Sequence, residues 1–426
     1  MKRNADTEPR FDMSAAPRKE KWFLTPIKKL LCADAKKHKP QIFYDGTENM
    51  KGPFLLLCNH NAFLDFKIAA TLLGKNKANY VVAVDGFIGR EGIMRNVGCI
   101  GKRKFTNDTT LIRNLKKSIN LGNVAVIYPE ARYSLCGTTA VLPQSLGKLA
   151  KILDVPVAVL ICHGHHINSP FWDTSHDRGV KPTEADYIRL FTVEELRKAT
   201  PDEINEKIVS AFQYDDFAWQ KERGILVKDR KRADGLHKVL YKCPVCKTEN
   251  KMGAEGTKLF CRACNKEWEM LENGDLQGVS GETVYNRIPD WYEWERACVK
   301  AEVEAGTYST GELKVQADSL PNSKGYIDIG HGTMTHDMNG FKVSVTDGDG
   351  VTRTMDKPVP SLYSCHIEYR YLFKKGDCVD LNTLTDTWYV YPEGEEFSVT
   401  KMAIATEELY FKYMRDKGIT LPAGLA

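Results

Sequence analysis

The sequence has no apolar run long enough to cross a membrane and no visible leader peptide. None of its apolar runs reaches the 18 residues that a spanning helix needs. The first nine residues, Met1–Pro9, lack the apolar stretch of a signal peptide. These absences predict a cytoplasmic protein whose membrane contact would be peripheral, on the inner face.

A strong excess of one charge is also missing. The 60 Lys and Arg residues nearly balance the 56 Asp and Glu residues, and the net charge of +4 is small for 426 residues. Nucleic acid is therefore not an expected partner. The composition, 42% hydrophobic and 27% charged, is that of a folded protein, and the length allows two or three domains of about 150 residues each.

The 12 cysteines do not form the pattern of a disulfide framework. Eight are scattered, several inside apolar runs: Cys32, Cys58, Cys99, Cys136, Cys162, Cys298, Cys365 and Cys378. Scattered buried thiols suit a reducing compartment.

The other four cysteines are clustered. Cys243 and Cys246 form one C-x2-C knuckle, and Cys261 and Cys264 form a second one fourteen residues later. Two such knuckles predict a zinc ribbon over residues 242–275, with 266–270 returning as a strand. Four thiolates leave no open coordination position, so the Zn²⁺ would be structural.

The N-terminal segment, residues 1–39, has two parts. Residues 1–17 are polar without clear period and predict a loose tail. Residues 18–39 carry eight Lys or Arg against Glu20 and Asp34, with large apolar side chains interleaved: Trp22, Phe23, Leu24, Ile27, Leu30 and Leu31. This pattern fits a helix in a membrane interface, or an amphipathic helix packed on its own domain.

Residues 40–213 alternate between strand and helix patterns. Apolar runs predict strands at 54–58, 80–84, 123–128 and 155–161. Helical periodicity falls at 65–74, 107–120, 145–153 and 192–213. This order predicts an α/β domain whose mostly parallel sheet has helices on both faces.

The rest of the chain divides into a basic linker, the ribbon and a β-rich domain. Residues 214–241 fit a solvated linker. Residues 276–426 begin with an aromatic-rich helix at 282–306, continue with strand patterns to 396, and end in a helix at about 399–415. At the level of fold this last domain resembles a pleckstrin-homology-like barrel.

The chemistry begins with His60, which follows the strand at 54–58 and precedes Asp65 in an H-x4-D pattern. Ligand sites of α/β sheets lie at the carboxyl ends of strands. Asp65 would fix the tautomer of His60 and leave its other nitrogen free as a base. The alternative is an ordinary histidine at a strand end, with Asp65 capping the next helix.

Two further polar clusters would reach the same edge of the sheet. The first is Lys102, Arg103 and Lys104; the second is Glu130, Arg132 and Ser134, directly after the strand at 123–128. A base beside fixed cations suits a substrate with an anionic head and a reacting hydroxyl.

Four motifs in this order resemble those of the glycerolipid acyltransferase family, the PlsC-like family that includes 1-acylglycerol-3-phosphate acyltransferase. Residues 59–65 are similar to its Asn-His-x4-Asp motif and 98–104 to its second motif, which ends in Arg. Residues 128–134 resemble Phe-Pro-Glu-Gly-Thr-Arg-Ser, and 155–157 resemble an apolar strand with a central Pro. The resemblance spans about residues 40–200.

The resemblance implies an O-acyltransferase of phospholipid biosynthesis. His60 would deprotonate the glycerol hydroxyl, which attacks the thioester of acyl-CoA or acyl-carrier protein, and Asp65 would orient His60. The substrate-binding residues would be Asn59, Lys102, Arg103, Lys104, Glu130, Arg132 and Ser134. No acyl-enzyme is needed, so Cys58 is interpreted as a core thiol.

The motifs depart from the family pattern at two places. Arg132 stands two residues after Glu130 instead of three, with Ala131 replacing the usual Gly, and Arg103 stands one position early. These departures leave open an acceptor other than 1-acylglycerol 3-phosphate. A catalytically silent lipid-binding adaptor and a zinc-ribbon nucleic-acid binder are the alternatives from other classes. The run at 163–166, which contains three histidines, is expected to line the site or cap the strand rather than bind metal.

Overall fold

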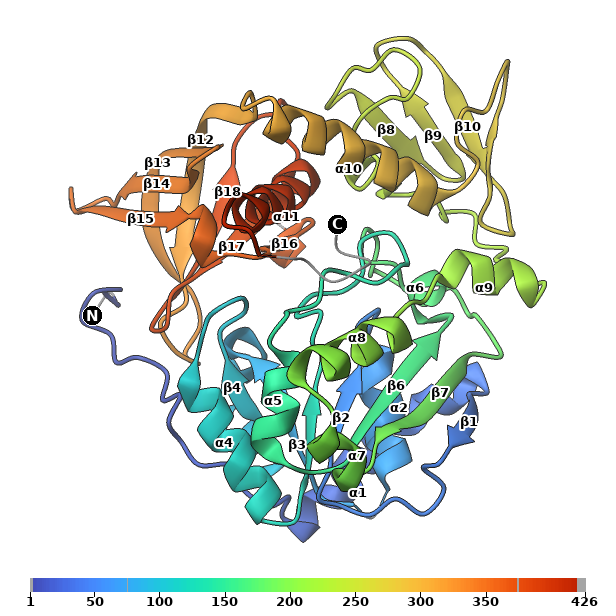
Figure 1. Ribbon diagram of the computed structural model, residues 1–426. Helices are drawn as coiled ribbons and strands as arrows, with labels where there is room; N and C mark the ends of the chain where they lie inside the picture. Colours follow the sequence, from blue (N-terminus) through green and yellow to red (C-terminus); the bar gives the residue numbers. More distant parts are fainter. Residues whose placement is uncertain (1–2, 75, 374, 420–426) are drawn as a thin grey trace.

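The computed structural model describes residues 3–74, 76–373 and 375–419. Within them the chain forms an α/β domain, a small antiparallel sheet and a larger antiparallel sheet covered by two helices (Figure 1). The expected fold class, an α/β domain followed by a cysteine-containing unit and a β-rich part that ends in a helix, is confirmed.

The α/β domain is built on a seven-stranded sheet in the order β1-β7-β6-β2-β5-β3-β4. All neighbouring strands are parallel except β6 and β7. The strands are β1 (Gln41–Asp45), β2 (Leu55–Cys58), β3 (Ala78–Ala83), β4 (Ile100–Lys102), β5 (Val124–Ile127), β6 (Val157–His163) and β7 (Glu184–Phe191). The four strands expected from apolar runs are β2, β3, β5 and β6.

Helices cover both faces of this sheet because the central strands are apolar at successive positions, whose side chains point to opposite sides. Leu56 packs with α2 (Phe63–Leu73), whereas Leu55 and Leu57 pack with α5 (Leu146–Leu153) on the other face. The other helices of this domain are η1 (Trp22–Leu24), α1 (Thr25–Cys32), η2 (Ala33–His38), η3 (Val84–Phe87), α3 (Glu91–Asn96), α4 (Thr109–Asn120), α6 (His165–Asn168), α7 (Val193–Lys198) and α8 (Pro201–Ala211). The single helix expected at 192–213 is two, because Thr200 caps a new helix that starts at Pro201.

The segment expected to be a solvated linker is instead folded into the protein. It contains α9 (Asp216–Glu222) and η4 (Leu236–Lys238). Trp219 and Leu240 are buried in the same core as the ribbon and the C-terminal sheet. The basic side chains of this segment suggested a linker, but its buried aromatic and aliphatic side chains pack it into the protein.

The cysteine-containing unit is a four-stranded antiparallel sheet in the order β11-β10-β9-β8. Its strands are β8 (Met252–Glu255), β9 (Lys258–Cys261), β10 (Glu267–Met270) and β11 (Leu276–Gly278). Trp268 of β10 packs edge-on against Trp291 of α10 (Ile288–Glu304), with ring centroids 4.9 Å apart. The aromatic residues of that helix therefore belong to the core.

The C-terminal sheet has the order β15-β14-β13-β12-β18-β17-β16 and is antiparallel throughout. Its elements are β12 (Ser309–Ser319), β13 (Ile327–Asp337), β14 (Gly340–Thr346), β15 (Thr352–Pro358), η5 (Val359–Ser361), β16 (His366–Glu368), η6 (Tyr371–Phe373), β17 (Cys378–Asn382), β18 (Thr387–Pro392) and α11 (Val399–Asp416). Over the described residues its end strands β15 and β16 do not pair, so the sheet is open and the expected barrel is not formed.

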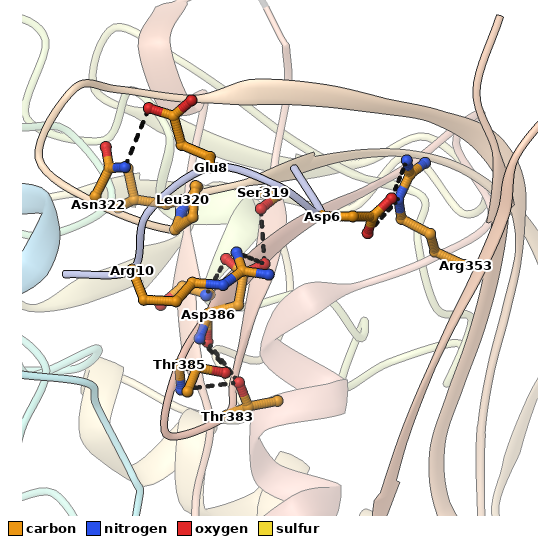
Figure 2. Close-up of polar contacts among 12 residues, drawn as sticks. Asp6, Glu8, Arg10, Ser319, Leu320, Asn322, Arg353, Thr383, Thr385 and Asp386 are labelled. Carbon is orange, nitrogen blue, oxygen red and sulfur yellow. Dashed lines mark hydrogen bonds and ion pairs between the residues drawn. The ribbon is translucent and has the colours of Figure 1, made fainter. Parts of the chain in front are cut away.

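The N-terminal residues are not the expected loose tail. Residues 3–10 run beside the C-terminal sheet (Figure 2), and the chain then passes to the α/β domain, where the Asp12 and Met13 carbonyls accept hydrogen bonds. Asp6 pairs with Arg353 at 2.7 Å, Arg10 pairs with Asp386 at 3.4 Å, and Phe11 is buried. The N-terminal segment is thus joined to the C-terminal sheet by residues that are more than 300 positions apart in the sequence.

Candidate active site

His60 lies in the short loop between β2 and α2, where the central strand ends. Its ring sits between Tyr128 and Tyr133, with centroid distances of 4.5 and 4.4 Å. The side chain is 24% exposed. The two tyrosines fix the plane of the imidazole and leave part of the ring within reach of a substrate.

Asp65, in the first turn of α2, receives donors from three sides. Its Oδ2 accepts hydrogen bonds from the backbone N–H groups of Asn61 (2.5 Å) and Ala62 (2.8 Å) and lies 3.6 Å from Nδ1 of His60. Its Oδ1 lies 2.5 Å from Nδ1 of His165. Burial would raise the pKa of Asp65, but the hydrogen bond from His165 and the nearby imidazole of His60 outweigh it and hold that pKa at about 2. The carboxylate is therefore ionised at neutral pH.

His165 is the site residue to which sequence reasoning assigned no role of its own. It begins the short helix after β6, and β6 is the neighbour of β2 in the sheet. Its ring is fully buried, and its Nε2 has no hydrogen-bond partner among the described residues. The expectation that the histidines at 163–166 line the site holds for His165; nearby His163 bonds Asp186 at 3.1 Å.

Glu130 fixes the loop that carries His60. Its Oε1 accepts the backbone N–H of His60 at 2.9 Å, and its Oε2 accepts the N–H of Ala140 and the hydroxyl of Tyr214. Burial raises the pKa of Glu130 to about 8, against these three hydrogen bonds, which favour the charged form. Glu130 thus holds the loop of His60 in place through its buried hydrogen bonds.

Asn59 and Ser134 also act within the protein. The Asn59 amide exchanges two hydrogen bonds with the backbone of Cys162, at 2.9 and 2.8 Å, and so ties β2 to β6. The Ser134 hydroxyl donates to the Thr138 carbonyl at 2.6 Å. Both side chains are buried, so the substrate-binding role implied for them by the resemblance does not fit their positions.

The guanidinium group of Arg103 is hydrogen-bonded to the C-terminal sheet and its loops. Its guanidinium donates four hydrogen bonds of 2.7 to 3.0 Å, to the carbonyls of Leu320, Pro321 and Thr385 and to the Thr387 hydroxyl. The side chain is 2% exposed. The prediction that Arg103 binds the substrate phosphate is therefore corrected. Its guanidinium N–H groups already donate to oxygen atoms of the protein.

Arg132 is committed in the same way. It donates to the Glu407 carboxylate of α11 at 2.6 Å and to the Cys365 carbonyl at 3.3 Å. Ala131 before it has a φ of 56°, in the left-handed region that suits the Gly of the family motif. Ala131 thus allows the turn that the Gly of the motif would make. Arg132, which follows it, points towards α11.

The two lysines beside Arg103 differ from each other. Lys102 donates to the carbonyl and hydroxyl of Thr106, and burial lowers its pKa to about 8. Lys104 lies 3.7 Å from both Asp85 and Asp380. Burial alone would lower the pKa of Lys104, but these two carboxylates outweigh it and raise that pKa. Both lysines line a small pocket between the α/β domain and β17–β18.

Cys58, the last residue of β2, is fully buried, and burial raises the pKa of its thiol well above the usual value. A protonated, buried thiol is a poor nucleophile. This fits the expectation that Cys58 is a core residue.

The four clustered cysteines converge on one point. The Sγ atoms of Cys243 and Cys264 are 3.7 Å apart, and so are those of Cys246 and Cys261. Four sulfurs bound at about 2.3 Å to a tetrahedral ion lie about 3.8 Å from one another. These thiols therefore fit a single metal ion of that geometry.

Comparison with known proteins defines the class of the α/β part. Residues 37–161 match the family model described as Acyltransferase. The part of the chain that carries the four motifs is thus similar to that family. The matched range includes His60, Asp65 and the residues of the two polar clusters.

Among solved structures the chain is similar to the 1-acyl-sn-glycerophosphate (LPA) acyltransferase PlsC from Thermotoga maritima. The identity is 12%, the match covers 46% of this chain and 82% of that chain, and the TM-score is 0.35. A likeness at this level carries no argument about substrate. The search of curated proteins gave no match.

Proposed function

We propose that this chain transfers an acyl group from acyl-CoA or acyl-carrier protein to the free hydroxyl of a lysophospholipid. The first acceptor to consider is 1-acylglycerol 3-phosphate, which would give phosphatidic acid. The observation that supports this is the His60–Asp65 pair. The His60 ring lies between two tyrosines, and both residues lie in the range that matches the Acyltransferase model.

The reaction needs one base and no covalent enzyme intermediate. Nδ1 of His60 faces the ionised Asp65, so Nε2 is the nitrogen that takes the proton from the acceptor hydroxyl. The hydroxyl oxygen bonds to the thioester carbon, and the carbon–sulfur bond then breaks. The departing thiolate takes the proton from His60, which returns the base to its starting state.

A second candidate acceptor is favoured by the two arginines. Arg103 and Arg132 already donate to protein oxygens of the C-terminal domain. The guanidinium groups that would bind a phosphate bidentately are thus occupied. An acceptor whose head group is not a phosphate monoester is the alternative within the same chemistry.

Product analysis would separate these acceptors. Purified wild-type protein would be offered acyl-CoA with an equimolar mixture of lysophosphatidic acid, other lysophospholipids and monoacylglycerol, and the products would be identified by mass spectrometry. We expect one acylated product with release of free CoA. Binding of lysolipid without any acylated product would contradict acyl transfer and support a silent adaptor.

We further propose that the N-terminal helices hold the enzyme on a membrane surface. The structure has no helix, over its described residues, that meets the length and hydropathy needed to cross a bilayer. Trp22 and Leu30 are 81% and 78% exposed, and Ile27 is also exposed, among the lysines of α1. Exposed apolar side chains beside basic ones suit an anionic lipid surface. Phe63, exposed at the start of α2, extends this patch towards His60.

Vesicle flotation tests this contact. Replacement of Trp22 and Leu30 by Glu should abolish flotation with anionic vesicles, whereas Leu226→Glu, at an exposed leucine on the segment after α9, should not. Equal flotation of wild type and the double variant would refute the proposed membrane surface.

We propose zinc as the ion of the four-cysteine cluster. Zinc favours a closed tetrahedral set of four thiolates, and the two knuckles supply it. The ion would be structural, because no ligand position remains for a substrate.

A further inference from the structure

A second cluster of metal-ligating side chains lies between the C-terminal sheet and the acyltransferase domain. His366 and Glu368 stand on β16, and Asp380 stands opposite His366 on β17. One ligand atom from each of the three lies within 4.8 Å of the others. His366 and Asp380 are buried. These residues come from a part of the chain outside the acyltransferase motifs.

Asp380 lacks the hydrogen bonds that a buried carboxylate requires. Its Oδ1 receives only a thiol contact from Cys378, at 3.8 Å. Its Oδ2 is buried and has no hydrogen-bond partner among the described residues; Lys104 Nζ lies 3.7 Å away and His366 Nδ1 lies 3.9 Å away. Because buried polar atoms are nearly always satisfied, this oxygen indicates a missing partner.

The hydrogen bond of His366 leaves its other nitrogen free. Nδ1 lies 2.8 Å from the Ile367 carbonyl, so Nδ1 carries the proton and Nε2 presents a lone pair. Glu368 Oε1 lies 3.6 Å from Nε2. Two acceptors that face each other need a positive partner between them. A histidine that donates one N–H to a backbone carbonyl is also the usual arrangement of a metal ligand.

The charges of the cluster favour a divalent ion. Asp85 joins Glu368 and Asp380 around the single ammonium of Lys104. The three carboxyl groups outnumber the one ammonium in this buried place, and a divalent cation supplies the positive charge that lets all three be ionised there. A pocket lined by Asp85, Lys104 and Asp380 adjoins this point.

We propose that His366, Glu368 and Asp380 bind a divalent first-row metal ion that accepts mixed nitrogen and oxygen ligands, such as Mn²⁺. The cluster lies close to His60: Tyr133 packs on His60 and on Phe171, and Phe171 contacts His366. The ion would place positive charge near the acceptor, where the two arginines supply none. This last consequence rests on the proposed acyltransferase function, whereas the binding site itself does not.

Mn²⁺ binding to the full chain, with the cysteine cluster loaded with zinc, tests the site. Calorimetric titration and electron paramagnetic resonance should show one Mn²⁺ per wild-type chain. Glu368→Gln and Asp380→Asn should each weaken binding on the order of a hundredfold. The matched control is Asp318→Asn, because Asp318 is an equally buried carboxylate of the same sheet that already pairs with Lys375. It should bind Mn²⁺ like the wild type.

Two results would overturn the site: no Mn²⁺ bound by wild-type protein, or undiminished affinity in Glu368→Gln. Glu368 is less buried than Asp380, so its variant keeps the test decisive if Asp380→Asn does not fold. Acyl transfer is measured separately on the same wild-type preparation. Absent Mn²⁺ binding with intact acyl transfer would refute the metal site alone, and bound Mn²⁺ without acyl transfer would refute the enzyme alone.

Discussion

Asp65 joins three elements at a single carboxylate. It belongs to α2, faces His60 from the loop after β2, and accepts a hydrogen bond from His165, which follows β6. The pattern around His60 and Asp65 is local, so the sequence was enough to place His60 at the end of a strand with Asp65 facing it. His165 lies 100 residues from Asp65, and only the order of strands in the sheet brings them together.

We predict that His165 positions Asp65 and thereby His60. His165→Ala should lower kcat by about a hundredfold, because Asp65 loses its shortest side-chain bond and the base shifts. Asp65, with its pKa near 2, stays ionised from pH 5 to 9, so its titration adds no inflection to the wild-type profile in this range.

Rate–pH profiles and melting curves of the wild type and His165→Ala check this prediction. The variant should fold and show a changed profile. An unchanged kcat and profile in folded His165→Ala would show that His165 has no part in positioning the base. His176→Ala, at a partly exposed histidine paired with Asp229, is the matched control.

The arginines show where residue-level reasoning reached its limit. The sequence around Arg103 and Arg132 indicated a phosphate site, as the family motifs do. Their partners, which include Thr387 of β18 and Glu407 of α11, lie more than 200 residues further along the chain. No local pattern reveals that a downstream domain will occupy these donors.

At the scale of elements, Arg103 joins the loop after β4 to the C-terminal sheet. We predict that Arg103→Ala lowers the free energy of unfolding by about 3 kcal/mol, because buried oxygens lose their donors. Denaturant unfolding measures this. Retained stability together with a raised KM for a phosphate-bearing acceptor would instead favour the phosphate role.

The elements with strong periodicity were predicted best. The buried strands β2, β3, β5 and β6 and the helices α2, α4 and α5 were expected within a few residues of their observed bounds. The edge strand β1 and its neighbour β7 were not expected, because both carry polar side chains within them. The helix at 192–213 was wrong in one respect: a Thr-Pro pair inside it starts a second helix.

The cysteine unit gives a prediction of its own. Metal analysis should find one tightly held zinc per chain. Cys261→Ser or a strong chelator should lower the melting temperature, since Trp268 of this unit packs on α10. Cys298→Ser, at a cysteine outside the cluster, is the control. Protein that contains no zinc and melts normally would contradict the ribbon.

At the scale of the whole molecule, the α/β domain, the cysteine-containing unit and the C-terminal sheet share more contacts than their order in the sequence indicates. One core contains Leu135 of the α/β domain, Trp268 of the cysteine-containing unit and Leu409 of α11. The N-terminal residues lie beside the C-terminal sheet and pair with two of its residues, Arg353 of β15 and Asp386 next to β18 (Figure 2). The sequence predicted the order of an α/β part, a cysteine-containing unit and a β-rich part, but how these parts dock depends on long-range contacts.

We therefore predict one cooperative unfolding transition for residues 3–419 in calorimetry. The shared core and the buried Arg132–Glu407 pair leave no part that could melt alone without exposing buried charge. Two well-separated transitions, one for the α/β domain and one for the rest, would contradict this.

The central claim is that His60 is the base of an acyl transfer. The most direct measurement is the initial rate of free thiol release from acyl-CoA by purified protein in the presence of lysolipid acceptor. We predict that His60→Ala lowers this rate by about 10²- to 10⁴-fold while the protein stays folded, and that His331→Ala, at an exposed histidine on β13, keeps the wild-type rate. An unchanged rate in His60→Ala would contradict the account.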